Sequence, residues 1–256
     1  MTRIFCIANQ KGGVGKTTTS INLAASLAAH NKKVLLIDLD PQGNATMGSG
    51  VDKQELTKGV YQVLVGLNTI AESRQISVQG KYDVLPSNRE LTGAEIELIE
   101  VENRNTCLKQ AIQATDNAYD FILIDCPPAL SLLTLNALCA AEQVIIPMQC
   151  EYFALEGLSD LINTIRQVHV QLNPQLEIMG LLRVMFDPRI TLQQQVSEQL
   201  KDHFGKKVFN TLIPRNIRLA EAPSHGLPGV IFDPSSRGAQ AYLQFGAEII
   251  DRLNSL

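Results

Sequence analysis

The sequence has few cysteines, and they are not paired. Five cysteines occur in 256 residues, no two of them form a Cys-x-x-Cys motif, and most lie inside apolar runs. Isolated cysteines in such runs usually behave as small buried hydrophobic residues. We therefore expect reduced, buried thiols in a cytoplasmic protein rather than a disulfide framework.

Long hydrophobic runs and linkers are also missing. No apolar stretch approaches the roughly 20 residues that cross a bilayer. The apolar run after Arg3 ends at Asn9, which is too early for a secretory signal. No repeat, low-complexity segment or Pro/Gly/Ser-rich linker divides the chain. Because 45% of the residues are hydrophobic, a sizeable core can form, and we expect residues 1–256 to make a single domain.

What the sequence does contain is a regular succession of short apolar runs and longer helical patterns. The runs are continuous rather than alternating, which is typical of strands covered by helices on both faces. The rhythm predicts an α/β fold with a doubly wound, mostly parallel sheet and helices on both faces. The expected strands are 4–8, 33–40, 82–87, 119–128, 142–149, 176–186 and 207–214. Helices are expected from Thr17 to about His30, over the long pattern 89–115, before 142–149 and in the C-terminal tail.

The segment 9–18, NQKGGVGKTT, links the first expected strand to the first helix. Its glycines let the backbone wrap closely, so that N–H groups point at phosphate oxygens, and the helix N-terminus adds partial positive charge. Lys16 can reach the β- and γ-phosphates, and the Thr17 hydroxyl can ligate Mg²⁺. The expected nucleotide-binding residues of this loop are Lys11, Gly12, Gly13, Val14, Gly15, Lys16, Thr17 and Thr18.

The loop departs from the standard P-loop in two positions. Gln10 stands where a glycine is usual, and Lys11 is an additional lysine. In this form the loop resembles the deviant Walker A motif of the ParA/MinD family of ATPases. The resemblance continues through VLLIDLDPQGNAT, FILIDCPPALSLLTLNAL, QCEYFALEGL, IPRNIRLAEAPSHG and DPSSRGAQAYL, which are similar to the chromosomal ParA (Soj) branch in particular. It implies a P-loop ATPase of the deviant Walker A subclass, a weak ATP hydrolase that uses ATP and Mg²⁺ and is stimulated by a partner.

Three carboxylates at strand ends are candidates for the chemistry. Asp125 ends an apolar strand, where a carboxylate is well placed to hold Mg²⁺ directly or through water. Asp38 and Asp40 are alternate residues of another expected strand, so both can point toward the phosphates. The resemblance implies that Asp40 positions the attacking water and that Asp38 lies near the metal and the loop. Aspartates that only cap a helix or precede a turn are the alternative for all three.

The resemblance also implies which segment binds the adenine base and what the second lysine does. Pro214, Arg215 and Asn216 follow the last strand, and family members contact adenine with this segment. The Asn-Lys-x-Asp guanine signature is absent, which favours ATP over GTP. Lys11 has little to hold in its own loop, and the resemblance implies that it reaches across a dimer to the partner subunit's ATP. The catalytic candidates are therefore Lys11, Lys16 and Asp40, and a solvated lysine is the alternative for Lys11.

The formal charge of −4 argues against a protein coated with positive charge, but it permits a local basic patch. Residues 183–218 hold seven basic side chains, namely Arg183, Arg189, Lys201, Lys206, Lys207, Arg215 and Arg218, against three acidic ones. The resemblance implies that Arg189 and Arg218 contact DNA phosphates, independently of sequence and sensitively to salt. Only eight residues precede Asn9, so we expect no helix-turn-helix extension. A solvated helix face is the alternative for the lysines.

The function implied by the resemblance is that of a DNA-partitioning ATPase on the nucleoid. ATP would drive a sandwich homodimer, the dimer would bind double-stranded DNA non-specifically, and a ParB-type centromere-binding partner would trigger hydrolysis and release. A MinD-like membrane switch needs a terminal helix rich in Lys and Arg, but the tail has Arg252 against Glu248 and Asp251, so we expect no stable membrane association. A nitrogenase-reductase-like electron carrier needs cysteines that bridge a cluster at the dimer face. This chain has Cys126 but no second suitably placed cysteine, which argues against that class. A switch that positions another cargo stays open.

Overall fold

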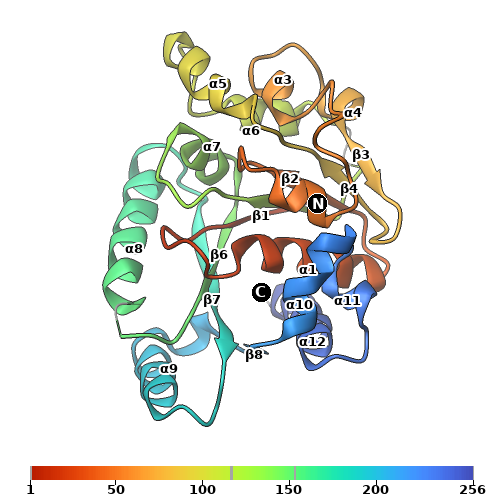
Figure 1. Ribbon diagram of the computed structural model, residues 1–256. Coiled ribbons are helices and arrows are strands. Elements are labelled where there is room, and N and C mark those ends of the chain that lie inside the picture. The colour runs from red at the N-terminus through yellow and green to blue at the C-terminus, as the bar shows by residue number, and fades with distance from the viewer. Residues whose placement is uncertain (1, 116–117, 153, 256) are drawn as a thin grey trace.

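The computed structural model describes residues 2–115, 118–152 and 154–255. Its centre is an eight-stranded sheet in the order β3-β4-β2-β5-β1-β6-β7-β8 (Figure 1). The strands are β1 (Arg3–Ile7), β2 (Val34–Asp38), β3 (Gln75–Ser77), β4 (Tyr82–Leu85), β5 (Phe121–Asp125), β6 (Gln143–Met148), β7 (Glu177–Phe186) and β8 (Val208–Pro214). All neighbouring strands are parallel except β3 and β4. The predicted doubly wound, mostly parallel sheet is confirmed.

Helices cover both faces of this sheet. They are α1 (Lys16–Ala29), α2 (Asn44–Gly48), α3 (Val60–Leu64), α4 (Ile70–Ser73), α5 (Leu91–Glu97), α6 (Cys107–Gln113), α7 (Leu132–Ala140), α8 (Ala154–Gln171), α9 (Thr191–Phe204), α10 (Ile217–Glu221), α11 (Gly229–Phe232) and α12 (Arg237–Asn254). Three 3₁₀ turns, η1 (Leu98–Glu100), η2 (Gly205–Lys207) and η3 (Ala222–His225), extend α5, α9 and α10. Among the described residues, no helix combines the length and the apolar character that a bilayer crossing requires.

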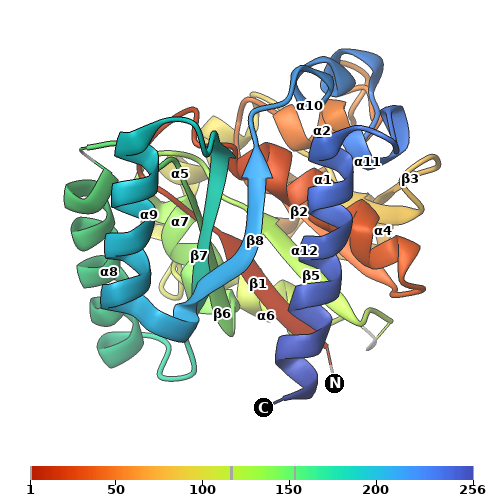
Figure 2. The same cartoon turned by 90° about the horizontal axis from the view of Figure 1, so that it is seen from below.

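The hydrophobic core has two halves, one on each face of the sheet. Successive strand residues point to opposite faces, so Phe5 and Ile7 lie in one half and Cys6 lies in the other. The first half packs α1 and α12 against the sheet, and the second packs α6, α7, α8 and α9. Figure 2 shows α9 and α12 on opposite sides of β7 and β8. This double coverage is why the strands read as continuous apolar runs.

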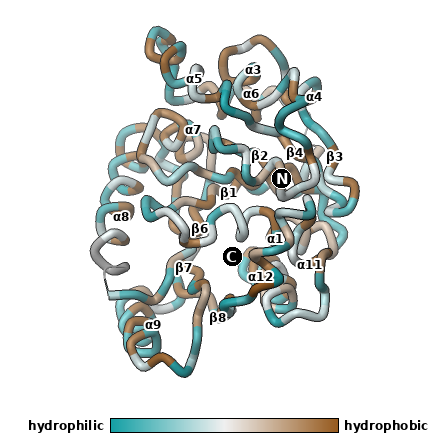
Figure 3. Tube along the Cα trace, viewed as in Figure 1, coloured by the Kyte–Doolittle hydropathy of each residue, from teal (hydrophilic) through white to brown (hydrophobic). Residues whose placement is uncertain are grey.

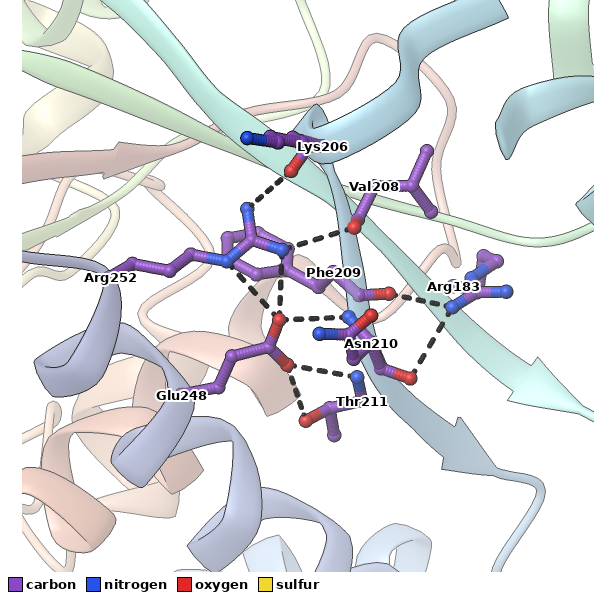
Figure 4. A network of polar contacts seen from close by, with 8 residues as sticks. All are labelled: Arg183, Lys206, Val208, Phe209, Asn210, Thr211, Glu248 and Arg252. Carbon is purple, nitrogen blue, oxygen red and sulfur yellow. Dashed lines mark hydrogen bonds and ion pairs between the residues drawn. The ribbon is translucent and has the colours of Figure 1, made fainter. Parts of the chain in front are cut away.

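The contact between β8 and α12, called the β8–α12 seam below, is held by partly buried charges (Figure 4). Glu248 accepts hydrogen bonds from the backbone N–H groups of Asn210 (2.8 Å) and Thr211 (2.9 Å) and from the Thr211 hydroxyl (2.7 Å). Arg252 pairs with Glu248 and lies 4.1 Å from the centroid of the Phe209 ring. The terminal helix is therefore fixed to the sheet, as a packed C-terminal helix requires.

Three expectations about the fold were wrong. The helical pattern 89–115 is broken into α5, η1 and α6, because 101–106 forms turns in which Arg104 N–H bonds to the Val101 carbonyl and Thr106 N–H to the Asn103 carbonyl. The antiparallel edge strand β3 has only three residues and was not expected. All five cysteines are free thiols, but only four are buried and Cys107 is half-buried.

Candidate active site

The loop 9–18 leaves the carboxyl end of β1 and enters α1. Gly13 and Gly15 have φ angles of 73° and 75°, in the left-handed region that other residues avoid. A Cβ atom at Gly12 or Gly13 would meet no atom within 4 Å, so open space lies beside this backbone. Gly15 also caps the N-terminus of α1, where unpaired N–H groups favour an anion. These features fit the phosphates of a nucleotide.

Lys16 lies inside this loop, with 7% of its surface exposed. Its ammonium donates to the Lys11 carbonyl at 3.2 Å. Burial lowers the pKa of Lys16, while the negative charge of Asp125 acts in the opposite direction. A cation that burial has stripped of water gains strongly from an added anion. The position therefore suits a lysine that binds phosphate.

Asp125 lies at the end of β5, beside Ile7 of β1, and is completely buried. It accepts hydrogen bonds from the hydroxyls of Thr17 (2.7 Å) and Ser20 (2.8 Å). Burial, together with the charge of Asp38, raises the pKa of Asp125 to about 7. A carboxylate and a hydroxyl in contact are the oxygen donors that Mg²⁺ prefers, so Thr17 and Asp125 fit a magnesium site. Ser20 was missed, although its place one helical turn after Lys16 could have suggested it.

Asp38 is also fully buried, at the end of β2 and opposite Asp125. Its Oδ2 atom accepts from the Thr46 N–H (2.8 Å) and hydroxyl (2.7 Å), and its Oδ1 atom accepts from the Asp40 N–H (3.2 Å). Burial raises the pKa of Asp38 to about 6. The side chain thus ties the segment after β2 to the start of α2. Thr46 gave no signal in the sequence, because its partner is defined only by the turn between them.

Asp40 lies outside β2, which ends two residues earlier than expected. The argument that Asp38 and Asp40 share a strand face therefore fails. Asp40 Oδ1 accepts from the Gln42 N–H at 2.9 Å, and the Asp40 carbonyl accepts from the Ser87 hydroxyl at 2.9 Å. Its charge nevertheless acts on both Lys16 and Asp125, so the turn brings Asp40 to the same site.

Lys11 is half exposed, and its ammonium forms an ion pair with Glu151 of the same chain at 2.5 Å. The sequence indicated that Lys11 has little to hold in its own loop, and its partner indeed lies outside the loop, after the end of β6. The contact belongs to a brace between the loop and the end of β6. In this brace Gln149 donates to the Gly13 carbonyl (3.0 Å) and Asn9 donates to the Pro147 carbonyl (2.8 Å). Gln149 and Glu151 are the first and third residues of the segment QCEYFALEGL, so this brace gives the start of that segment a structural role.

A cavity of about 180 Å³ adjoins the loop beside α1. The predicted base segment lines it with Pro214, Arg215 and Asn216, opposite Gly15 and Thr18. Residues that the sequence did not indicate complete the walls, namely Val184, Met185, Ile213, Leu219, Ala220 and Tyr242. Met185 has a φ of 52°, unusual for a residue with a side chain, and its sulfur accepts from Gln149 Nε2 at 3.2 Å. The base candidates and the phosphate loop therefore form one continuous site.

The basic residues of 183–218 do not form one patch. Arg183 is 1% exposed and donates to the Ser197 hydroxyl (2.7 Å) and the Phe209 carbonyl (2.6 Å), so it cannot contact DNA. Lys206 and Lys207 precede β8 and lie at the amino edge of the sheet. Arg189, Arg215 and Arg218 follow the carboxyl ends of the adjacent strands β7 and β8, at the same edge as the phosphate loop.

The two DNA candidates are exposed but already paired. Arg189 forms an ion pair with Asp187 at 2.7 Å, and 87% of its side chain is exposed. Arg218 pairs with Glu221 at 2.9 Å and lies 3.4 Å from Asp233. Exposed pairs of this kind are worth little, typically about 0–1 kcal/mol, so an incoming phosphate can compete for either arginine.

A family model described as an AAA domain matches residues 2–178. The sporulation initiation inhibitor protein Soj of Bacillus subtilis is 51% identical over 249 residues, which are 97% of this chain and 98% of that protein. The chromosome-partitioning ATPase Soj of Thermus thermophilus is 50% identical over 251 residues, which are 98% of this chain and 96% of that protein.

Solved structures share the whole fold. A Mycobacterium smegmatis protein described as cobyrinic acid a,c-diamide synthase, with bound ADP and magnesium, superposes with a TM-score of 0.88. It is 36% identical, and the match covers 100% of this chain and 96% of that one. Its identity is lower than that of the two Soj proteins, so the synthase activity in its description is not carried over. Its bound ligands agree with the ATP and Mg²⁺ expected from the loop.

Proposed function

This chain belongs to the Soj/ParA family of P-loop ATPases, and from that premise we propose that it partitions DNA through an ATP-controlled dimer. The observation that carries the proposal is the loop with two lysines in different surroundings. Lys16 is buried among the groups suited to phosphate, whereas Lys11 is half exposed and points to Glu151. Lys16 serves the nucleotide of its own chain, and Lys11 can exchange its exposed ion pair with Glu151 for the nucleotide of a second chain.

The chain is an ATP hydrolase that uses ATP and Mg²⁺. The groups that would hold the phosphates are the backbone of residues 11–18 and the Lys16 ammonium, and Thr17 and Asp125 would hold the metal. Bound Mg²⁺ would neutralise charge on the phosphate oxygens. Asp38 accepts a hydrogen bond from the Thr46 hydroxyl and so helps to position the segment beside the metal site. We assign Asp38 an indirect contact with the metal. Pro214, Arg215 and Asn216 would hold the adenine.

Asp40 is the residue that we assign to the attacking water. The turn after β2 holds its backbone through Ser87 and Gly43, so the carboxylate is carried on a fixed segment near Lys16 and Asp125. In a loose phosphoryl-transfer transition state, a carboxylate mainly orients the water rather than removing its proton.

Lys11 would cross to the partner subunit's ATP and neutralise charge there, as an arginine finger does elsewhere. The ion pair with Glu151 is exposed on both sides, so its loss costs little, about 0–1 kcal/mol. The triphosphate of a second chain offers more negative charge than one carboxylate. ATP would therefore become a condition for forming the homodimer.

DNA would bind along the edge that carries Arg189 and Arg218. Two chains paired through their phosphate loops would present both sets of arginines together, and binding would be non-specific and strongly weakened by salt. We further propose that residues 1–256 act as one domain, that a ParB-type partner stimulates hydrolysis, and that the protein acts on the nucleoid in the cytoplasm. The MinD-like alternative is not supported, since Tyr242, Phe245 and Ile249 of α12 are buried in the core.

The test is co-sedimentation with non-specific double-stranded DNA in the presence of ATP, of ADP and of no nucleotide, over a salt series. Wild type is expected to sediment with DNA only with ATP and to lose binding steeply as salt rises. Lys11→Ala should bind ATP but neither dimerise nor sediment, and Arg189→Glu with Arg218→Glu should dimerise without sedimenting. Equal sedimentation of wild type with ATP and with ADP would remove the proposal.

A further inference from the structure

A second cavity lies away from the nucleotide site, among α3, α4 and α6 at the outer end of the sheet (Figure 1). Its volume is about 630 Å³, within the roughly 300–1,000 Å³ typical of ligand pockets. Ala118 and Tyr119 line it just before β5 begins, whereas the phosphate loop follows the carboxyl end of the parallel strand β1. The cavity is therefore not an extension of the ATP site.

The floor of this cavity is apolar and well packed. Val63, Leu64 and Ile70 line it with 4%, 3% and 1% of their surface exposed, and all three belong to the hydrophobic core. Five small residues also line the cavity, of which Ala111 is half-buried and Gly66, Ala71, Ala114 and Ala118 are exposed. A buried apolar floor beside small exposed residues suits an apolar group that enters from outside.

One end of the cavity holds a positive charge that is already neutralised. Arg74 pairs with Asp83 and donates to the Tyr119 hydroxyl at 2.9 Å. Tyr119 donates in turn to Asp83 at 2.6 Å. Because the three groups satisfy one another, this end offers no unpaired cation to an acidic ligand.

The surface beside the mouth is acidic and apolar, and we call residues 95–102 the acidic ridge. Val101 lines the cavity with 40% of its surface exposed, between the exposed Glu100 and Glu102. Ile96 and Ile99 on the same ridge are 71% and 56% exposed. Figure 3 shows apolar and polar residues mixed over α5 and the neighbouring α3 region.

Basic side chains near the ridge do not balance its charge. Residues 95–104 contain four glutamates and one arginine, Arg104, which donates to the Ile99 carbonyl at 2.9 Å. Lys109 of α6 is not among the residues that line the cavity. The ridge thus offers negative charge together with exposed aliphatic side chains.

We propose that the cavity and the acidic ridge bind a basic amphipathic helix from a partner protein. Apolar side chains of the helix would enter the cavity and cover Ile96, Ile99 and Val101, and its lysines or arginines would face Glu97, Glu100 and Glu102. Exposed aliphatic residues rimmed by charge mark protein contact sites. The negative ridge repels nucleic acid and anionic lipid, which leaves a cationic protein segment as the occupant.

Cys107 provides a reporter for this site. It lines the cavity and is half-buried, whereas the other four cysteines are buried. The probe is a synthetic leucine–lysine peptide ordered as an amphipathic helix, compared with a peptide of the same composition in scrambled order. The amphipathic peptide is expected to slow alkylation of Cys107 at least about tenfold at physiological ionic strength, and the scrambled peptide should leave the rate nearly unchanged.

Two variants test the two halves of the proposed site. Ala114→Trp, two helical turns after Cys107, should fill the cavity and remove the protection, and Glu100→Lys with Glu102→Lys should weaken peptide binding at least about tenfold. Glu198→Lys with Asp202→Lys makes the same charge change on exposed positions of α9 and should protect as wild type does. ATP binding, measured for each variant, establishes that it is folded.

Three results would each overturn the proposal. Equal protection by the scrambled peptide would mean adsorption by charge alone. Undiminished protection with both variants would place the peptide elsewhere. Protection that rises with protein concentration in the absence of peptide would mean that a second copy of this chain covers the ridge. None of these outcomes depends on DNA binding or on dimerisation by ATP, so the partition proposal stands or falls separately.

Discussion

The nucleotide site buries its carboxylates Asp38 and Asp125 completely and the β8–α12 seam buries Glu248 partly, and the pKa values in the two regions move in opposite directions. In the nucleotide site, burial raises the pKa of Asp38 to about 6, and burial with the charge of Asp38 raises that of Asp125 to about 7. In the seam, burial also acts to raise the pKa of Glu248, but hydrogen bonds from Thr211, Asn210 and Arg252 outweigh it and lower the pKa. The two regions differ in what surrounds the charge.

The difference distinguishes a binding site, whose negative charge is not balanced within the chain, from a structural contact, whose negative charge is. At the seam, Glu248 accepts two backbone N–H bonds and a guanidinium, so its charge is matched within the chain. At the nucleotide site, Asp125 accepts hydrogen bonds from the hydroxyls of Thr17 and Ser20 and lies opposite another carboxylate. The buried Lys16 ammonium lies in the same site, but two facing carboxylates carry more negative charge than one lysine offsets, and excess negative charge is expensive in a protein interior. A bound metal ion would supply the positive charge that balances these carboxylates.

The largest expected effect is on ATP binding, through Lys16→Ala. Removing a buried cation from its anionic ligand should weaken ATP binding by about 1,000-fold. Titration of a fluorescent ATP analogue measures this loss. Lys206→Ala is the matched control, because the exposed Lys206 contributes only its carbonyl to the seam. ATP affinity within a few-fold of wild type in Lys16→Ala would contradict the phosphate assignment.

Asp125→Asn should separate function from stability at the nucleotide site. Hydrolysis should fall about 100-fold or more, as when one preorganised electrostatic group is removed from an active site. Without nucleotide, the free energy of unfolding should stay equal or rise, because a buried charge facing Asp38 is lost. Phosphate release and urea unfolding measure the two quantities. A clear loss of stability without nucleotide would mean that Asp125 is mainly structural.

Glu248→Gln at the seam should lower stability and leave ATP binding unchanged, the opposite of what is expected for Asp125→Asn. The substitution removes charge from hydrogen bonds to Asn210, Thr211 and Arg252, and it should cost about 1.5–3 kcal/mol of the free energy of unfolding. ATP affinity should stay as in wild type, because the seam is not part of the nucleotide site. Urea unfolding and ATP titration are the measurements, and unchanged stability would show that the seam charges contribute nothing.

The smallest expected effect is on the pH dependence of the difference in the free energy of unfolding between wild type and Glu248→Gln. The pKa of Glu248 is lower in the folded chain than in the unfolded one, so its contribution is complete above the unfolded value of about 4.3. It is lost as the pH falls through the folded value. Urea unfolding of wild type and Glu248→Gln at decreasing pH should therefore give curves that converge in acid. A difference that stays constant down to about pH 3 would contradict the assignment.

The parallel sheet could be predicted because each of its strands is buried on both faces and reads as an apolar run. All seven expected strands are present, with ends displaced by a few residues. The edge strand β3 could not be found this way, since Gln75 and Ile76 are exposed and its three residues give no pattern. The break between α5 and α6 also escaped, because the helical pattern of 89–115 continues through turns that tertiary contacts stabilise.

The candidate site divides in the same way. The glycine loop, Lys16, Thr17 and Asp125 lie together as expected, because local backbone chemistry and the ends of adjacent strands determine their positions. The partners Ser20, Thr46 and Met185 were not expected. Contacts such as Met185 with Gln149 join distant parts of the chain, and no local sequence rule describes them.

By itself, the sequence determined the order of strands and helices, the phosphate loop and the presence of a second lysine, since these depend on burial periodicity and on backbone chemistry within a few residues. Only the tertiary structure decided which charges are free to act. It buried Arg183 against Ser197 and Phe209, although the sequence counted this arginine in a basic excess that could have served DNA. It also placed Lys11 on Glu151, 140 residues away. The sequence does not distinguish a buried charged side chain from an exposed one. Only the packing of the chain determines whether the charge contacts water, a backbone carbonyl or a carboxylate.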